Sequence, residues 1–380
     1  MVFFTVGSLC CALSGSFVLL VLSRMLQGVG AAMVMSVNGS LVRLIYPKRH
    51  LAKGFGLNAT VVALASVAGN LERKVFSVRM MRTISGAILS VASWPWLFAV
   101  NLPFGVLTFF LARRYLPGNP TRVEGRRFDF PSAVLNALTF GLFIGCVEAF
   151  SHGLSFRWIV AGVVLLAGIG TVFVRRQLRQ PYPMLPFDLL RIPVFSLSVL
   201  TSILSFTSQM LGMVALPFMF HLTFGMSAAE TGLLMTAWPL VIVVAGPLAG
   251  TLATKIHPGL LGGVGLLVMS VGCFLLADVS PSVGYGGLVA RLMLCGFGFG
   301  LFQSPNNHLL LSSAPSYRTG GASGMQATAR LVGQTTGAAL VALLFYLNGD
   351  RAPHAAMWLA GGFTLCGSLV SCSRLRAHRF

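Results

Sequence analysis

Charged residues are scarce in this chain, and acidic residues are the scarcest of them. Only 9% of its 380 residues are charged, and 8 acidic residues stand against 27 lysines and arginines. A water-soluble domain carries about 25% charged residues, because its surface must face water. Since 56% of the residues are hydrophobic, most of the surface must face hydrocarbon instead. The composition therefore excludes an ordinary soluble globule.

Long apolar runs decide which kind of membrane protein this is. Backbone groups in lipid are satisfied only in helices or in a closed barrel, and runs of about 20 apolar residues favour helices. The sequence predicts an all-α polytopic membrane protein with about 12 transmembrane helices. The predicted spans are 1–13, 17–45, 51–69, 97–116, 131–150, 157–174, 195–222, 231–252, 260–278, 286–312, 320–347 and 355–373.

The cysteines and the other reactive side chains indicate no chemistry. The 7 cysteines are an odd number, and their spacing fits neither a metal site nor a disulfide framework. Most of them lie in apolar runs, where cysteine behaves as a small hydrophobe. The chain also has no phosphate-binding loop and no nucleophile beside a base. We expect no enzyme activity, no metal and no cofactor.

The net charge of +19 is explained by membrane topology rather than by nucleic-acid binding. The basic residues lie in short loops between apolar runs, without the aromatic-interleaved basic face of a nucleic-acid binder. They gather in alternate connections, and lysine and arginine are retained on the cytoplasmic side of a membrane. We expect an inner-membrane location with both termini cytoplasmic and no cleavable signal peptide. Leu185 and Leu189, in the amphipathic part of 175–195, are expected in the membrane interface.

Two motifs in the first apolar runs can be assigned a role. In "RMLQG", Arg24 and Gln27 are three residues apart and share one helical face. A guanidinium in a membrane needs a cavity or a partner, so we expect a packed, cavity-facing Arg24; the alternative is an interfacial arginine that reaches outward. Small residues along 54–69 would let two helices approach closely.

At these motifs the chain resembles the major facilitator superfamily, and specifically its fourteen-helix drug:proton antiporter branch. R-x-x-Q-G at 24–28 is similar to the family's fourth-helix motif. Gly56 and Gly69 match the fifth-helix antiporter motif G-x8-G-x3-G-P-x2-G-G, and the pattern resumes at Gly86. "ASWPWLFAVNLPFG" (92–105), "RLMLCGFGFGLFQSPNN" (291–307) and "ASGMQATARLVGQTTGAAL" (322–340) resemble further signatures of that branch.

The chain departs from that family in two places. Against the pattern it lacks the first two helices, and residues 70–82 stand where the motif has its proline, as an insertion or as an error in the sequence. Their charges are expected to loop out at the extracytoplasmic face. The resulting division is a remnant N-terminal bundle of four spans (1–116), a linker with two intervening spans (117–194), a six-helix C-terminal bundle (195–373) and a basic cytoplasmic tail (374–380).

Proton coupling requires a buried carboxylate whose pKa is raised towards neutrality. No acidic residue lies at the centre of a predicted span. Glu148 and Asp278 touch the ends of spans, and Glu148 is more readily explained as an interfacial residue than as a proton carrier. The candidates for proton relay are therefore Arg24, Gln27 and Glu148.

Polar and aromatic residues inside the apolar runs indicate a substrate path. Asparagine and glutamine in lipid require partners, and prolines bend transporter helices where backbone lines a cavity, as Pro239 and Pro247 would. Packing against lipid is the alternative for each aromatic residue or methionine. The candidates are Asn38, Phe206, Gln209, Met213, Trp238, Gln303, Asn306, Asn307, Arg330 and Gln334.

The resemblance implies proton-coupled efflux of hydrophobic or cationic compounds by alternating access. The implied partners are the lipid bilayer, small hydrophobic or cationic substrates, protons and a periplasmic adaptor protein, with no nucleic acid. Two alternatives stay open. One is a truncated remnant that does not transport, because the missing helices should open one side of the N-terminal bundle; the other is an exporter of a metabolite or siderophore.

Overall fold

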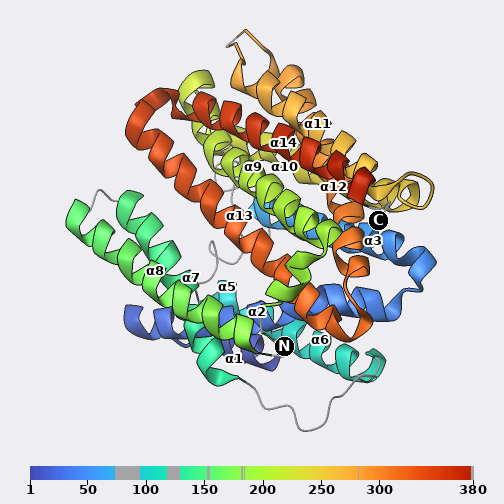
Figure 1. The fold of residues 1–380 in the computed structure, drawn as a ribbon. Coiled ribbons are helices and arrows are strands. Elements are labelled where there is room, and N and C mark those ends of the chain that lie inside the picture. Colours follow the sequence, from blue (N-terminus) through green and yellow to red (C-terminus); the bar gives the residue numbers. More distant parts are fainter. Residues whose placement is uncertain are drawn as a thin grey trace.

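The chain is helical throughout the part that the structure describes. The computed structural model describes residues 1–72, 95–116, 118, 129–151, 155–180, 183, 185–280 and 282–377. These residues form α-helices and short 3-10 turns and no strand, which confirms the predicted all-α class (Figure 1). The α-helices are α1 (Val2–Ala12), α2 (Phe17–Ile45), α3 (Leu51–Glu72), α5 (Trp96–Ala99), α6 (Asn101–Tyr115), α7 (Phe130–Ser151), α8 (Phe156–Arg179), α9 (Pro193–Phe224), α10 (Ala228–Leu252), α11 (Pro258–Ala277), α12 (Tyr285–Ser313), α13 (Thr319–Asn348) and α14 (Ala352–Ala377).

Most helices are long and apolar enough to cross a membrane. In the described chain 7 segments meet that criterion, and one of them, Ser316–Leu375, contains both α13 and α14. The others correspond to α2 and to α8 through α12. Each predicted apolar run except 97–116 corresponds to one helix, because a run long enough to span hydrocarbon can be recognised without tertiary information.

The first predicted span, 1–13, corresponds to the short helix α1. Helix α1 has 11 residues, which cover about 16 Å, roughly half of a 30 Å hydrocarbon layer. Gly30, near the middle of α2, packs against the backbone of Phe4. The first residues of α1 therefore lie level with the middle of α2. The cytoplasmic position of Met1 stays a prediction.

Helix continuity also differs from the sequence prediction. The predicted span 97–116 is divided into α5 and α6 around Val100, whereas α10 runs unbroken through Pro239 and Pro247. Pro247 cannot donate to the carbonyl of Val243, four residues earlier. The hydroxyl of Thr60 in α3 donates to that carbonyl at 3.1 Å. A neighbouring helix thus satisfies the backbone acceptor that the proline leaves free.

The turn between α9 and α10 follows from local sequence signals. Gly225 takes the left-handed conformation with φ of 62°, which residues with a Cβ atom rarely adopt. Ser227 then caps α10: its hydroxyl accepts from the amide of Glu230, and the Glu230 carboxylate accepts from the amide of Ser227. This reciprocal capping fixes where α9 ends and α10 begins.

Helices α9 to α14, here the C-terminal group, pack together around one apolar core. Its largest fully buried side chains include Trp238, Phe220 and Phe302. Helices α11 and α12 approach to backbone contact, since a Cβ atom on Gly298 would lie 2.4 Å from the amide nitrogen of Met269 and 2.5 Å from the carbonyl oxygen of Gly265. Glycine at the crossing permits this distance.

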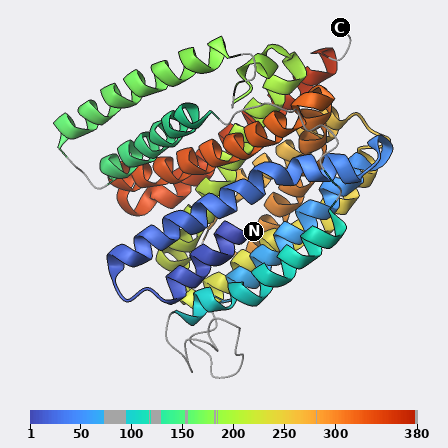
Figure 2. The same cartoon turned by 90° about the horizontal axis from the view of Figure 1, so that it is seen from below.

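Helices α1, α2, α3, α5 and α6 form the N-terminal group. Helix α1 packs against α2 and α6, while α3 packs mainly against α10 and α12 of the C-terminal group rather than against α2. Helices α7 and α8 form a hairpin at the outer edge, where α7 touches α13 (Figures 1 and 2). The division 1–116, 117–194 and 195–373 stays a prediction, because α3 adheres to the second group. Helix α3 ends at Glu72, so most of the predicted insertion 70–82 lies outside the described residues.

Cations gather where α2, α8, α12 and α14 end, here called the basic end. Arg43 of α2 donates to the carbonyl of Leu311, and at 3.1 Å to that of Ala314, both at the end of α12. Arg318 forms an ion pair with Asp188. These contacts join the two helical groups and the segment before α9 at the basic end.

Two predictions about the basic end are wrong. Leu185 and Leu189 are 8% and 3% exposed, so they pack inside the protein rather than in the membrane interface. Arg374, which the prediction placed in the basic cytoplasmic tail 374–380, instead belongs to α14 and is 1% exposed. Its guanidinium faces the carbonyl of Leu197 at 3.4 Å. In both cases the neighbouring α9 covers side chains that the sequence pattern left at the surface.

We expect Gly298→Val to destabilise the C-terminal group. The added side chain would overlap the backbone of α11, and overpacking of this kind costs on the order of 3 kcal/mol. The melting temperature of the purified chain in detergent should fall by several degrees. Gly168→Val in α8 is the matched control, because nothing lies within 4 Å of its Cβ position. Equal melting of the two variants would contradict the close crossing.

Candidate functional site

A cavity of about 60 Å³ lies between α3 of the N-terminal group and four helices of the C-terminal group. Helices α9, α10, α12 and α13 supply its remaining walls. The lining side chains are mostly apolar or aromatic, with two amides, one hydroxyl and one guanidinium. They are Ala59, Val62, Ala63, Ser66, Phe206, Gln209, Met213, Trp238, Pro239, Ile242, Phe299, Gln303 and Arg330.

Aromatic rings give this cavity its shape. Phe206 and Phe299 meet edge to face with ring centroids 5.6 Å apart. Trp238 is fully buried, and a Cβ atom on Gly212 would lie 3.2 Å from its ring, so glycine at this position lets the indole pack closely against α9. Rings held in this way offer a rigid apolar surface to a flat aromatic molecule.

One cation, Arg330, lies at the cavity wall and has no carboxylate partner among the described residues. The guanidinium of Arg330 lies over the Phe206 ring, 5.5 Å from its centroid. Such a cation–π contact stabilises the charge by about 0.5–2 kcal/mol. None of the described residues that line the cavity is acidic, and the sequences of α9, α12 and α13 contain no aspartate or glutamate. The field in the cavity is therefore positive.

Several of the substrate-path residues predicted from the sequence meet in this cavity. They come from four separate helices and more than a hundred residues of chain. They are Phe206, Gln209, Met213, Trp238, Gln303 and Arg330. Their convergence places polar side chains and rings in one space, as a binding site for a largely apolar molecule requires.

The other path candidates lie elsewhere. Asn306 is buried and its amide donates to the hydroxyl of Ser202 at 2.7 Å, so it ties α12 to α9. Asn307 is buried and Gln334 half-buried, but neither lines the cavity. Asn38 is exposed and donates to Asn58 of α3 at 3.2 Å. Asn306 and Asn38 thus have hydrogen-bond partners outside the cavity.

Arg24 and Gln27 form a separate chain of hydrogen bonds. The guanidinium of Arg24 donates to the Gln27 amide oxygen at 2.5 Å, and the Gln27 amide nitrogen donates to the hydroxyl of Ser8 at 2.7 Å. Arg24 also lies over the ring of Phe98 at 5.7 Å. The two residues share a helix face as predicted, but Arg24 is exposed and neither residue lines the cavity.

The remaining candidates concern helix packing and proton relay. A Cβ atom on Gly56 would lie 2.5 Å from the carbonyl oxygen of Gly246, so Gly56 sits at the closest approach of α3 to α10. Gly69 and Glu148 lie in α3 and α7, in stretches whose side chains are outside the described part, and Gly86 is outside it altogether. Their roles stay predictions.

Sequence reasoning missed the wall that α3 provides. Ala59, Val62, Ala63 and Ser66 line the cavity, yet they lie in the 54–69 stretch that was assigned to helix approach alone. Small residues do both: they bring α3 close to α10 and leave room beside the larger rings of the C-terminal group. Phe299, in its apolar run, carried no polar signal that could have marked it.

No metal site accompanies the cavity in the described chain. No group of three or more histidine, cysteine, aspartate or glutamate side chains there could hold an ion. In the arrangement described, the cavity of about 60 Å³ brings aromatic rings, two amides and one cation to one space.

Comparisons with known proteins agree with this architecture. A family model described as Major Facilitator Superfamily matches residues 1–338 and, in a second match, 197–378. Uncharacterized transporter YebQ of Escherichia coli K12 is 49% identical over 379 residues, which cover 100% of this chain and 80% of that protein. Riboflavin transporter RibZ of Clostridioides difficile is 27% identical, covering 90% of this chain and 71% of its own length.

Other relatives are longer than this chain. It spans 64% of multidrug resistance protein Stp of Mycobacterium tuberculosis, with 28% identity over 92% of its own residues. The fold resembles that of the human organic anion transporter MFSD10, with a TM-score of 0.65, 17% identity and coverage of 97% and 75%. The fourteen-helix branch and the missing helices stay predictions. The chain belongs to the Major Facilitator Superfamily and is a membrane transporter.

Proposed function

We propose that this transporter exports small hydrophobic compounds that carry an aromatic ring across a bacterial inner membrane, driven by proton entry. The observation that carries the proposal is the cavity between α3 and the C-terminal group, with its rings and its two amides. Two relatives support the substrate class through their names, one a multidrug resistance protein and one a riboflavin transporter. Both names fit a site that accepts flat aromatic molecules.

The positive charge of Arg330 at the cavity narrows the class of expected substrates. Arg330 faces the cavity with no carboxylate among the described lining residues, and like charges in a low-dielectric site repel strongly. Neutral or anionic aromatic compounds should therefore be preferred over the cationic compounds that the sequence resemblance implied.

Alternating access would depend on breaking and remaking the contacts between the basic end and the cavity. Retention of cations in the cytoplasm assigns that end to the cytoplasmic face. There Arg43 holds α12, and Gly56 and Thr60 hold α10. In this arrangement the cavity is closed towards the cytoplasm, and loading would require α3 and α10 to separate as the two groups rock.

Two features of the chain are the candidates for the route of the proton. The chain from Arg24 through Gln27 to Ser8 is a hydrogen-bonded line inside the N-terminal group, and Glu148 is the carboxylate candidate. Proton drive itself can be tested directly, because collapse of the pH gradient should stop accumulation of substrate in inverted vesicles.

We expect Arg330→Gln to change charge selection. In inverted vesicles that contain the full chain, uptake of the anionic dye fluorescein should fall about tenfold, the loss of one charged contact of about 1.4 kcal/mol, while the cationic dye ethidium should gain. Arg330→Lys, which keeps the charge, is the control and should retain most fluorescein uptake. Failure of the unaltered chain to move either dye would overturn the export proposal; unchanged selectivity in Arg330→Gln would overturn only the role of Arg330.

We expect Arg43→Gln to open the basic end. The variant removes two charged hydrogen bonds to carbonyls of α12, worth about 2 kcal/mol together or more. Hydrogen–deuterium exchange over residues 52–60 of α3 should become faster by roughly tenfold or more. Lys255→Gln, an exposed cation at the same end, is the control. Equal exchange in both variants would show that Arg43 does not hold the two groups together.

A further inference from the structure

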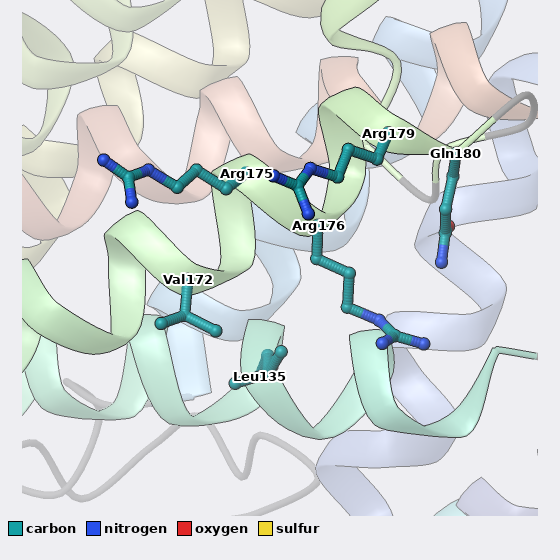
Figure 3. A pocket seen from close by; sticks show the side chains of 6 residues that line it. All are labelled: Leu135, Val172, Arg175, Arg176, Arg179 and Gln180. Atoms are coloured by element: carbon teal, nitrogen blue, oxygen red, sulfur yellow. The ribbon is translucent and has the colours of Figure 1, made fainter.

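A second, larger pocket lies far from the transport cavity, between α7 and α8 at the basic end. Its volume is about 540 Å³, and it is lined by Leu135 of α7 together with Val172, Arg175, Arg176, Arg179 and Gln180 at the end of α8. Figure 3 shows Arg176 reaching down towards α7, while Arg175 and Arg179 extend along the other side of α8. The pocket thus combines an apolar floor with three guanidinium groups.

The charges in this pocket are only partly balanced. Arg176 forms an ion pair with Asp129 at 3.1 Å and donates to the hydroxyl of Ser132 at 3.1 Å. Gln180 also donates to Asp129. Hydrogen bonds from Ser132, Gln180 and Arg176 keep the pKa of Asp129 well below its usual value, so this carboxylate stays ionised at any physiological pH and offsets one cation.

Arg175 and Arg179 have no such counter-charge. Both are exposed, and within the described chain neither forms a hydrogen bond or an ion pair. They lie four residues apart on α8, one above the other on a single face. Because Asp129 pairs with Arg176, the positive charges of Arg175 and Arg179 are not neutralised by a described carboxylate of the pocket.

The surroundings of these charges are apolar. Helix α8 packs mainly against α7, at the outer edge of the molecule. Its side chains Val164, Val172 and Leu178 are 65%, 56% and 63% exposed, which is a surface suited to acyl chains and not to water. Moving along α8 from Val164 to Arg179 therefore crosses from a hydrocarbon-facing surface to a cationic one.

We propose that this pocket binds the phosphate group of an anionic phospholipid, such as phosphatidylglycerol, with the acyl chains lying against Val172 and the exposed apolar face of α8. Arg175 and Arg179 would contact the phosphate, and Arg176, fixed by Asp129, would shape the pocket wall. Basic pockets at the ends of membrane helices bind anionic headgroups in this way, with about 1 kcal/mol for each cation near the surface. The apolar floor favours a lipid over free phosphate, because free phosphate gains nothing from it.

Native mass spectrometry of the full chain in detergent tests the proposal with dioleoyl-phosphatidylglycerol as the probe. The double variant Arg175→Gln/Arg179→Gln should weaken the apparent affinity about 30-fold, as expected for two cations. The control is Arg113→Gln/Arg114→Gln, which removes the same charge from exposed arginines at the end of α6, and it should bind lipid as the unaltered chain does. Dioleoyl-phosphatidylcholine, which has no net charge, should bind weakly to all three proteins.

Three results would overturn the proposal. Equal loss of phosphatidylglycerol in the two double variants would show that only the overall positive charge matters. Equal binding of phosphatidylcholine and phosphatidylglycerol would show that the arginines do not select the headgroup. Complete displacement of the lipid by inorganic phosphate would assign the pocket to free phosphate. Folding of each variant is checked by its elution from size-exclusion chromatography, so that a misfolded variant is not read as a loss of binding.

Discussion

The cost of placing charge in hydrocarbon governs this molecule. With 8 acidic residues against 27 basic ones, most cations cannot find a carboxylate partner, so they must lie at helix ends or be held by something else. Arg43 and Arg374 use backbone carbonyls, and Arg330 uses the face of Phe206. Each of these three arginines connects two helices. Arg43 joins the N-terminal group to the C-terminal group, and Arg330 gives the cavity its positive charge.

Small residues of α3 have two effects at its contact with α10. They allow the two helices to approach closely, and they leave space for the cavity. Gly56 brings the two backbones into contact, and Thr60 satisfies the carbonyl of Val243 that Pro247 leaves free. One turn further along α3, Ala59 and Ala63 are too small to fill the space opposite Trp238. A neighbouring helix thus supplies the hydrogen bond that α10 loses at Pro247, so the contact between α3 and α10 includes a polar interaction as well as close packing.

The sequence was sufficient for the helices and for about half of the site. Apolar runs mark spans directly, because their length is set by the membrane and not by neighbours. Gln209, Gln303 and Arg330 stood out as polar residues in such runs, and they do meet at the cavity. Asn306 carried the same signal, but its amide nitrogen donates to Ser202 instead, and the sequence cannot show which partner an amide will find. The contribution of α3 was missed because small residues in a sequence indicate close helix packing and do not show whether a cavity lies next to the contact.

The central claim is that a substrate sits between α3 and the C-terminal group. A cryo-electron microscopy structure of the full chain with a bound flat aromatic compound tests it most directly. We expect density for the compound against Phe206 and Trp238, within reach of Arg330. Density for the compound elsewhere, for example beside Arg24 and Phe98, with an empty space at Trp238, would contradict it.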